Sequence, residues 1–294
     1  MYCTTTYVYG MAGISSGEVG EAFVINAIAA AESIVDRLTN TTYWNIENNG
    51  TVSSATDNTL VHTSIAWVVD AYINEYVWVY AGTGIGQARL ITGNTVDTLT
   101  VDEDWVTNPD NTSKYRIVHT GTNAHIEEEL RDGDNTDEMY LDNYPLMILD
   151  AVTIDSVEVT PSKVYQYKEQ GRLVISSNAE ASNFPSKKAQ LNNIDYWFGV
   201  YPMIEMVKRL TGIYAALFIL QTQMGTTHNI PSTYSLPEGS VTIGQAYINI
   251  KGTWDTLMRN KVYMEKQIPK YASFFAWTLR IVYKQRTMRL REWV

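Results

Sequence analysis

The spacing of apolar residues predicts helices near both ends of the chain and strands between them. Near the N-terminus apolar residues recur at steps of three and four, which places them on one face of a helix; they are Val24, Ile28, Ala31, Val35 and Leu38. A second helical face follows Pro202 and is made of Met203, Val207, Leu210, Tyr214, Leu217 and Met224. A further helix is expected from Thr253 until Pro269 ends it, because proline cannot continue a helix.

The chain changes character between about Thr51 and Val118. It becomes rich in Thr, Asn, Val and Gly, and turn-forming dipeptides such as Gly93-Asn94 and Pro109-Asp110 separate short β-prone runs. These runs are Leu60–His62, Tyr76–Tyr80, Ala88–Thr92, Thr98–Val101 and Tyr115–Val118. The pattern predicts a small antiparallel β module.

Beyond this module the pattern is mixed. Glu127–Glu129 resembles a solvated helix face, whereas Ser156–Thr160 and Leu173–Ile175 are typical of strands. Ala246–Ile250 alternates like a strand, although a helix also fits there.

Together these patterns predict an α+β fold with a helical core, antiparallel β segments, an inserted small β domain and an extended C-terminal tail. The expected division is 1–50 for the N-terminal helical part of the core, 51–120 for the inserted β domain, 121–269 for the remaining β and helical core, and 270–294 for the tail.

Composition and charge restrict the classes of function that the chain can have. The 294 residues are 45% hydrophobic and 18% charged, which is typical of a folded chain. Residues 251–294 hold ten basic and three acidic residues, a formal charge of +7, while the rest holds 12 basic and 29 acidic residues, a charge of −17. Such an acidic body disfavours a general nucleic-acid surface, because phosphate binding needs a broad basic face. The longest apolar stretches fall short of the roughly 20 residues that cross a bilayer, so no membrane contact is expected.

No catalytic or metal-binding constellation stands out. Cys3 is the single cysteine, which excludes an intrachain disulfide and a thiolate metal site. His119 and His125 lie six residues apart, a spacing that fits no helical metal pair. Gly82–Gly86 lacks the lysine of a phosphate-binding loop, so we expect a tight hairpin turn there. Asp132–Glu138 lacks the glycine that a calcium-binding loop requires, so we expect a solvated turn there. We therefore expect no enzyme activity, no metal and no cofactor.

The tail joins basic charge to aromatic side chains. From Trp277 to Lys284 apolar and mostly polar residues alternate with the period of an extended strand. Such a strand can add to a sheet edge of its own chain or reach a partner, and both alternatives remain open. Because aromatic residues and arginine are frequent interface hot spots, the candidate partner-binding residues are Phe274, Phe275, Trp277, Arg280, Tyr283, Lys284, Arg286, Arg289, Arg291 and Trp293.

Three stretches then suggest a family. Ala30–Tyr43 closes the first helix, Asp134–Leu146 follows in the β region, and Tyr196–Gly199 leads into the next helix. In this order they resemble the head-to-tail connector (adaptor) proteins of tailed bacteriophages. The stretches Ala55–Leu60, Gly82–Gln87 and Thr98–Val101 are similar to a β insertion of phage structural proteins. The insertion is large for a minimal connector, and the tail matches no motif of the family.

The resemblance implies a helical connector core and a structural virion protein without enzyme activity. Such a chain would form a homo-oligomeric ring, usually of twelve copies, under the portal in the neck between capsid and tail, after assembly in the host cytoplasm. Its partners would be the portal protein and neck or tail proteins, with DNA only as passing cargo. The basic aromatic tail would then grip the portal.

Two other functions remain open. A glycan- or receptor-binding virion protein would use stacking platforms among the 20 Tyr and 8 Trp residues and expose the Thr- and Asn-rich β module. A hydrolase would need carboxylates that are dispersed in the sequence and converge in the fold.

Overall fold

The structure is a computed structural model that describes residues 1–121, 124–186, 192–227, 234–236, 239–241 and 244–269. The chain divides into two compact units. The first, here the helical unit, consists of Met1–Thr39 and Met203–Lys270, and the second, here the β unit, includes Asn40–Pro202. The β unit is therefore inserted between the second and third helices of the helical unit.

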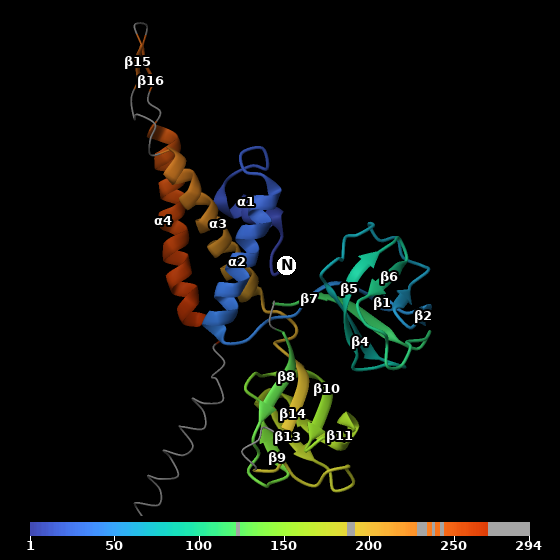
Figure 1. The fold of residues 1–294 in the computed structure, drawn as a ribbon. Coiled ribbons are helices and arrows are strands. Elements are labelled where there is room, and N and C mark those ends of the chain that lie inside the picture. Colours follow the sequence, from blue (N-terminus) through green and yellow to red (C-terminus); the bar gives the residue numbers. More distant parts are fainter. Residues whose placement is uncertain (122–123, 187–191, 228–233, 237–238, 242–243, 270–294) are drawn as a thin grey trace, which may run out of the picture. The chain divides into compact units, whose positions relative to one another are not determined.

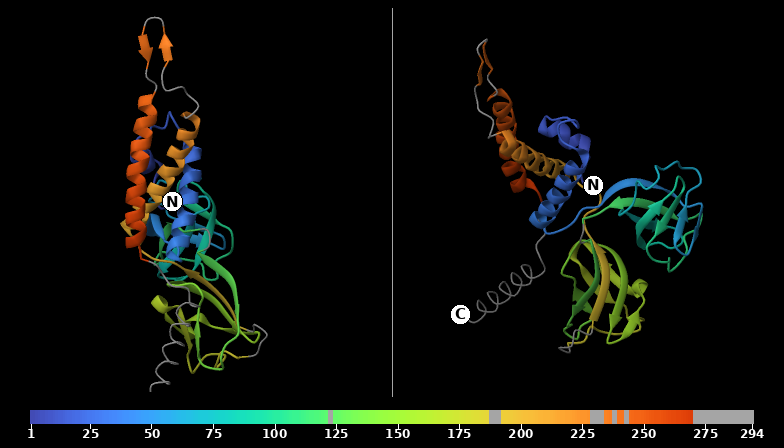
Figure 2. Two further views of the ribbon diagram at one scale, coloured as in Figure 1. Left: turned by 90° about the vertical axis from the view of Figure 1, so that its left-hand side faces the viewer. Right: turned by 45° about the horizontal axis from the view of Figure 1, so that its top comes forward.

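The helical unit is organised around its third helix. In the described residues its elements are α1 (Thr5–Ala12), α2 (Glu21–Thr39), α3 (Glu205–Thr227), the hairpin β15 (Tyr234–Leu236) and β16 (Gly239–Val241), and α4 (Gly244–Gln267). Helix α3 packs against α1, α2 and α4, and Figures 1 and 2 show it lying between α2 and α4. As a result α2 and α4 flank α3 on different sides.

The helix expected near the N-terminus is confirmed as α2. Of the five predicted inward positions, Val24, Ile28, Ala31 and Val35 are fully buried and Leu38 is half-buried, because the 3.6-residue period collects them on the side that meets α3. The helix ends where Asn40 takes a left-handed conformation with φ of 57°, a common way to stop a helix.

The first part of the β unit is a seven-stranded antiparallel sheet. Its strands lie in the order β1-β7-β4-β5-β6-β3-β2, and Val77, Leu99 and Ile117 are among the residues of its core. Their bounds are β1 (Asn45–Thr51), β2 (Ser54–Thr56), β3 (Thr59–Val61), β4 (Tyr76–Ala81), β5 (Ala88–Asn94), β6 (Thr98–Val101) and β7 (Lys114–His119). The five β-prone runs predicted in this region are confirmed as β3 to β7.

The second part of the β unit has two smaller sheets that share one core. One has the order β11-β10-β14-β8 and the other β12-β13-β9, and the buried cluster that includes Leu149, Leu173 and Tyr196 draws on both. The bounds are β8 (His125–Arg131), β9 (Glu138–Tyr140), β10 (Leu146–Ile154), β11 (Val157–Val159), β12 (Val164–Tyr167), β13 (Arg172–Ile175) and β14 (Asn192–Phe198), with short 3-10 turns at Pro161–Lys163 and Lys168–Gln170. The strands predicted at Ser156–Thr160 and Leu173–Ile175 are confirmed as β11 and β13.

An aromatic cluster fills the space between the two parts of the β unit. Trp44 lies at its centre with no solvent exposure, and its indole meets Trp78 and Trp197 edge-on, with ring centroids 5.5 and 5.9 Å away. The Trp44 Nε1 donates a hydrogen bond of 3.0 Å to the carbonyl oxygen of Phe198 at the end of β14. Both parts of the unit are thus tied to one indole ring.

The predicted fold class is wrong in its balance of helix and strand. In the described residues, 14 strands form the three larger antiparallel sheets and only four α-helices are present, so the protein is more β-rich than a helical connector core. The physical reason is that helical periodicity is confined to the two ends of the chain. The segment between them is rich in β-branched residues, Asn and Gly, which favour strands and turns.

Three local predictions are also corrected. Glu127–Glu129 belongs to strand β8 and not to a helix, and Gly93-Asn94 ends strand β5 instead of forming a turn. Helix α4 begins at Gly244, so the alternation of Ala246–Ile250 lies in a helix. Among the described helices, none combines the length and apolar composition that crossing a membrane would require.

Gly199 provides a test of the aromatic cluster. Its φ of +138° suits only glycine, and a Cβ there would lie 2.7 Å from Nε1 of Trp44 and 3.0 Å from Cγ2 of Thr42. We expect Gly199→Ala to lower the free energy of unfolding by about 2–4 kcal/mol, because the methyl group strains the backbone and displaces a buried indole. Urea unfolding followed by tryptophan fluorescence measures the change.

The matched control is Gly93→Ala, since a Cβ at Gly93 meets no atom within 4 Å. This variant should change the free energy of unfolding by no more than about 0.5 kcal/mol. Equal stability of the two variants would show that the Trp44 ring does not need the close approach of Gly199.

Candidate functional site

The candidate residues of the tail lie outside the described residues. They are Phe274, Phe275, Trp277, Arg280, Tyr283, Lys284, Arg286, Arg289, Arg291 and Trp293.

The two loops singled out in the sequence are turns, as predicted. Gly82, Gly84 and Gly86 all have positive φ, between 75° and 91°, and connect β4 to β5. In Asp132–Glu138 the backbone nitrogen of Thr136 donates to Oδ1 of Asp134 at 3.2 Å, which closes a turn between β8 and β9.

The two histidines in question have different surroundings. His119 Nδ1 lies 3.1 Å from the carboxylate of Glu75. His125 instead lies near two carboxylates, Asp150 and Asp195, which are distant from it in sequence. We call His125, Asp150 and Asp195 the His–Asp–Asp cluster, and it is the best candidate for chemistry in the β unit.

Three neighbouring strands bring this cluster together. Its members stand on β8, β10 and β14, and His125 is the direct cross-strand partner of Trp197. Trp197 also pairs with Ile148 of β10. Asp195 lies two positions from Trp197 and Asp150 two positions from Ile148, and because alternate residues of a strand share a face, both carboxylates lie on the face that carries Trp197.

The geometry of the cluster is fixed by close contacts. Nε2 of His125 lies 2.7 Å from Oδ1 of Asp195 and 3.8 Å from Oδ2 of Asp150. The imidazole stacks on the Trp197 indole with centroids 4.2 Å apart and planes 5° from parallel. The Trp197 Nε1 donates a hydrogen bond of 2.7 Å to Oδ2 of Asp150. The Trp197 indole therefore holds both the imidazole and one carboxylate in place.

Burial and nearby charges shift the pKa values of Asp150 and His125. Burial raises the pKa of Asp150 to about 6, the charge of Asp195 adds to this, and the hydrogen bond from Trp197 and the charges of His125 and Arg89 oppose it. Burial acts to lower the pKa of His125, but the hydrogen bond and charge of Asp195, with the charges of Asp150 and Glu127, outweigh it and raise that pKa.

The cluster can exchange a proton near neutral pH or hold a cation. Its three ligand atoms, one from each side chain, all lie within 4.8 Å of one another, and among the described residues no other group of three His, Cys, Asp or Glu side chains meets this condition. Sequence reasoning missed it because Asp150 and Asp195 are 25 and 70 positions from His125. One signal was present: Asp150 interrupts the otherwise apolar run from Leu146 to Val152.

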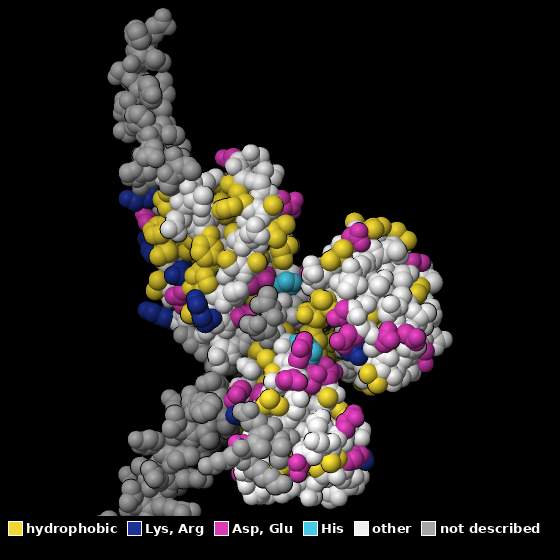
Figure 3. Space-filling model, viewed as in Figure 1, with side chains coloured by type: hydrophobic (Ala, Val, Ile, Leu, Met, Phe, Trp, Pro, Cys, Tyr) yellow, Lys and Arg dark blue, Asp and Glu magenta, His cyan; other side chains and the backbone are white. Residues whose placement is uncertain are grey.

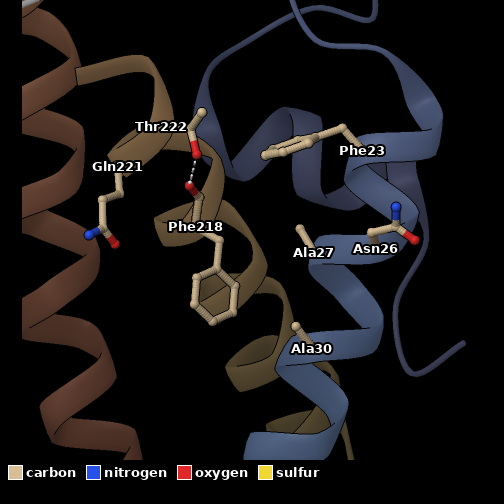
Figure 4. Close-up of a pocket in the computed structure, with 7 residues that line it drawn as sticks. All are labelled: Phe23, Asn26, Ala27, Ala30, Phe218, Gln221 and Thr222. Carbon is tan, nitrogen blue, oxygen red and sulfur yellow. Dashed lines mark hydrogen bonds between the residues drawn. The ribbon is translucent and has the colours of Figure 1, made fainter. Parts of the chain in front are cut away.

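The helical unit offers a different kind of site, an apolar groove. An open groove of about 420 Å³ lies between α2 and α3, and its lining residues are Phe23, Asn26, Ala27, Ala30, Phe218, Gln221 and Thr222. Figure 4 shows the rings of Phe23 and Phe218 on opposite walls, with the short side chains of Ala27 and Ala30 between them. Phe23 is 43% exposed. We call this surface the α2–α3 groove.

Helix α4 carries a second exposed apolar surface. Its inward residues Leu257 and Met264 are buried, whereas Val262 is 46% and Tyr263 is 65% exposed. We call Val262 and Tyr263 the α4 ridge. Apolar side chains also form broad patches over the helical unit in the space-filling view (Figure 3).

Comparison with known proteins adds no assignment. No protein family model matches the sequence, and no curated protein is significantly similar to it.

The pKa of Asp150 predicts a pH dependence of stability. A pKa of about 6 in the folded protein, against an ordinary value of 3.8, means that the folded state binds the proton more tightly than the unfolded state. This contribution to stability is complete below pH 4 and is lost as the pH rises through 6, by roughly 2–3 kcal/mol. The free energy of unfolding in urea, measured from pH 4 to 7 with a chelator present, should therefore fall more steeply in the native protein than in Asp150→Asn.

The Asn side chain keeps an oxygen to accept the hydrogen bond of Trp197, so the comparison isolates the charge. The same slope in both proteins would contradict the assignment of the raised pKa to Asp150.

Proposed function

We propose that the protein is a structural component of a tailed-bacteriophage virion, a head-to-tail connector that forms a closed ring beneath the portal and extends the DNA channel to the neck. The observation that carries the proposal is that one helical unit bears two different exposed apolar surfaces. These are the α2–α3 groove and the α4 ridge. The occupant proposed for the groove is the α4 ridge of a second copy of the chain.

The two surfaces suit each other in shape and chemistry. The groove is concave and apolar, with small side chains at Ala27 and Ala30 between two phenylalanine rings. The ridge offers a branched aliphatic residue and a tyrosine, a residue type that is enriched in interfaces. Burial of such side chains is the main favourable term in protein association.

A contact between unlike surfaces has a consequence for assembly. Each copy that fills the groove of its neighbour still presents its own groove to the next copy, so association continues until the rotation closes a ring or a filament grows. Helix α3 separates α2 from α4, which leaves the groove and the ridge able to meet two different neighbours. The resemblance to connector proteins favours the closed ring.

The charge distribution supports a channel that DNA passes through without binding. Outside residues 251–294 the chain carries 12 basic and 29 acidic residues. Acidic walls repel phosphate groups and keep DNA mobile, whereas a basic wall would retain it.

Head-to-tail association predicts complementation between two variants. Phe23→Asp places a charge in the groove and Tyr263→Asp places one on the ridge, so each variant alone should fail to form the oligomers that the native chain forms in analytical ultracentrifugation. An equimolar mixture should form dimers and nothing larger, because the intact ridge of one variant fits the intact groove of the other and both outer surfaces are blocked.

The control is Val106→Asp, which changes an 86% exposed residue of the β unit. It should assemble like the native chain. A mixture that stays monomeric while the native chain assembles would refute the groove–ridge contact.

The tail generates a separate prediction about the portal. Residues 271–294 include all ten candidate partner-binding residues, and their aromatic and basic side chains suit an acidic protein surface. Deletion of 271–294 should abolish capture by purified portal protein and leave the far-ultraviolet circular dichroism of the remaining fold intact. Undiminished capture by the portal would disprove the role of the tail.

A further inference from the structure

The most specific chemistry of the β unit is the His–Asp–Asp cluster, which the proposed connector function does not use. We propose that His125, Asp150 and Asp195 form a binding site for a divalent transition-metal ion, with Zn²⁺ as the best match. The inference stands on the geometry of the β unit and is independent of ring formation.

The donor set suits such an ion. A neutral imidazole is a good ligand for zinc and its neighbours in the first transition row, and carboxylate oxygens complete many such sites. With bonds of about 2.1 Å, ligand atoms around a tetrahedral ion lie about 3.4 Å apart. The distances of 2.7 and 3.8 Å from Nε2 of His125 to the two carboxylates bracket that value. A shift of several tenths of an ångström at Asp195 would admit the ion in place of the direct hydrogen bond.

The charge of the cluster also favours a cation. Three carboxylates act on the imidazole, those of Asp195, Asp150 and Glu127, and the imidazole can offset only one of their charges. Arg89 also acts on Asp150, but its guanidinium donates hydrogen bonds to the carbonyl oxygens of Ala88 and Asp104. A divalent ion between Asp150 and Asp195 would neutralise both carboxylates and leave the imidazole uncharged.

The surroundings hold the ligands in place in the way that metal sites need. Trp197 orients Asp150 through its Nε1 and His125 through ring stacking, which is the role of supporting contacts around metal ligands. The three ligands stand on three paired strands, β8, β14 and β10, so their backbone positions are fixed by the sheet. The ligand side chains are 21–30% exposed, which leaves room for an ion to enter and for water to complete its coordination.

Zn²⁺ titration of the full chain, after treatment with a chelator, tests the proposal by isothermal calorimetry. We expect one ion to bind per chain and to raise the melting temperature, because the ion binds the folded state and links three strands. The variants His125→Gln, Asp150→Asn and Asp195→Asn should each weaken binding at least about tenfold. The matched control His119→Gln removes a histidine that lies beside Glu75 and outside the His–Asp–Asp cluster, and it should bind Zn²⁺ like the native chain.

A second measurement covers the case in which a variant fails to fold. Co²⁺ added to the native chain should give visible absorption bands typical of nitrogen and oxygen ligands. In a separate titration, Zn²⁺ should shift the imidazole resonances of His125 and leave those of His119 in place. Absence of saturable binding at one ion per chain would overturn the proposal. Equal loss of affinity in His119→Gln, or a Zn²⁺-induced shift confined to His119, would overturn it as well.

Discussion

The burial of the Trp44 indole is the constraint on which the β unit depends. This ring has no solvent exposure, contacts Trp78 from the seven-stranded sheet and Trp197 from the four-stranded sheet, and donates a hydrogen bond to Phe198. Two antiparallel sheets that were only linked by the chain would be free to move, whereas a shared aromatic core and an obligatory indole hydrogen bond fix one arrangement. Trp197 contacts Trp44 in this core and also stacks on His125 of the His–Asp–Asp cluster, so packing and chemistry share a residue.

Neighbouring paired strands explain how the His–Asp–Asp cluster forms. In a regular strand neighbouring side chains alternate between faces, and pairing keeps each in register with its partner. Asp195 lies two positions before Trp197 in β14, and Asp150 lies two positions after the residue of β10 that pairs with Trp197, so both carboxylates share the face of the imidazole. Burial raises the pKa of Asp150 to about 6, and the charge of Asp195 adds to this. The fold tolerates these partly buried, neighbouring carboxylates because the surrounding strands and the Trp197 ring fix the positions of the side chains.

Local periodicity explains what could be predicted and distant partners explain what could not. Helix α2 and strands β3 to β7 follow from short-range spacing that the sequence displays directly. Glu129 illustrates the opposite case. It is 8% exposed in a strand because its carboxylate accepts hydrogen bonds from the Tyr196 hydroxyl and the Asp142 nitrogen, partners that no local pattern reveals. For the same reason, no local pattern reveals the His–Asp–Asp cluster. The predicted balance of helix and strand is wrong because helical periodicity at the two ends says nothing about the strands between them.

The helical unit contains apolar residues that its own folding does not require. On α2 the buried residues Val24 and Ile28 supply the inward face, yet Phe23 and Ile25 are 43% and 41% exposed. Exposed apolar side chains contribute little to the free energy of folding and favour association, so these exposed positions on α2 and α4 support the proposed contact between copies. The same contrast holds on α4, where Met264 is buried beside the exposed Tyr263. Two such surfaces on one unit, one concave and one convex, fit repeated contact between copies better than a single two-fold contact, because a two-fold dimer needs only one self-complementary surface.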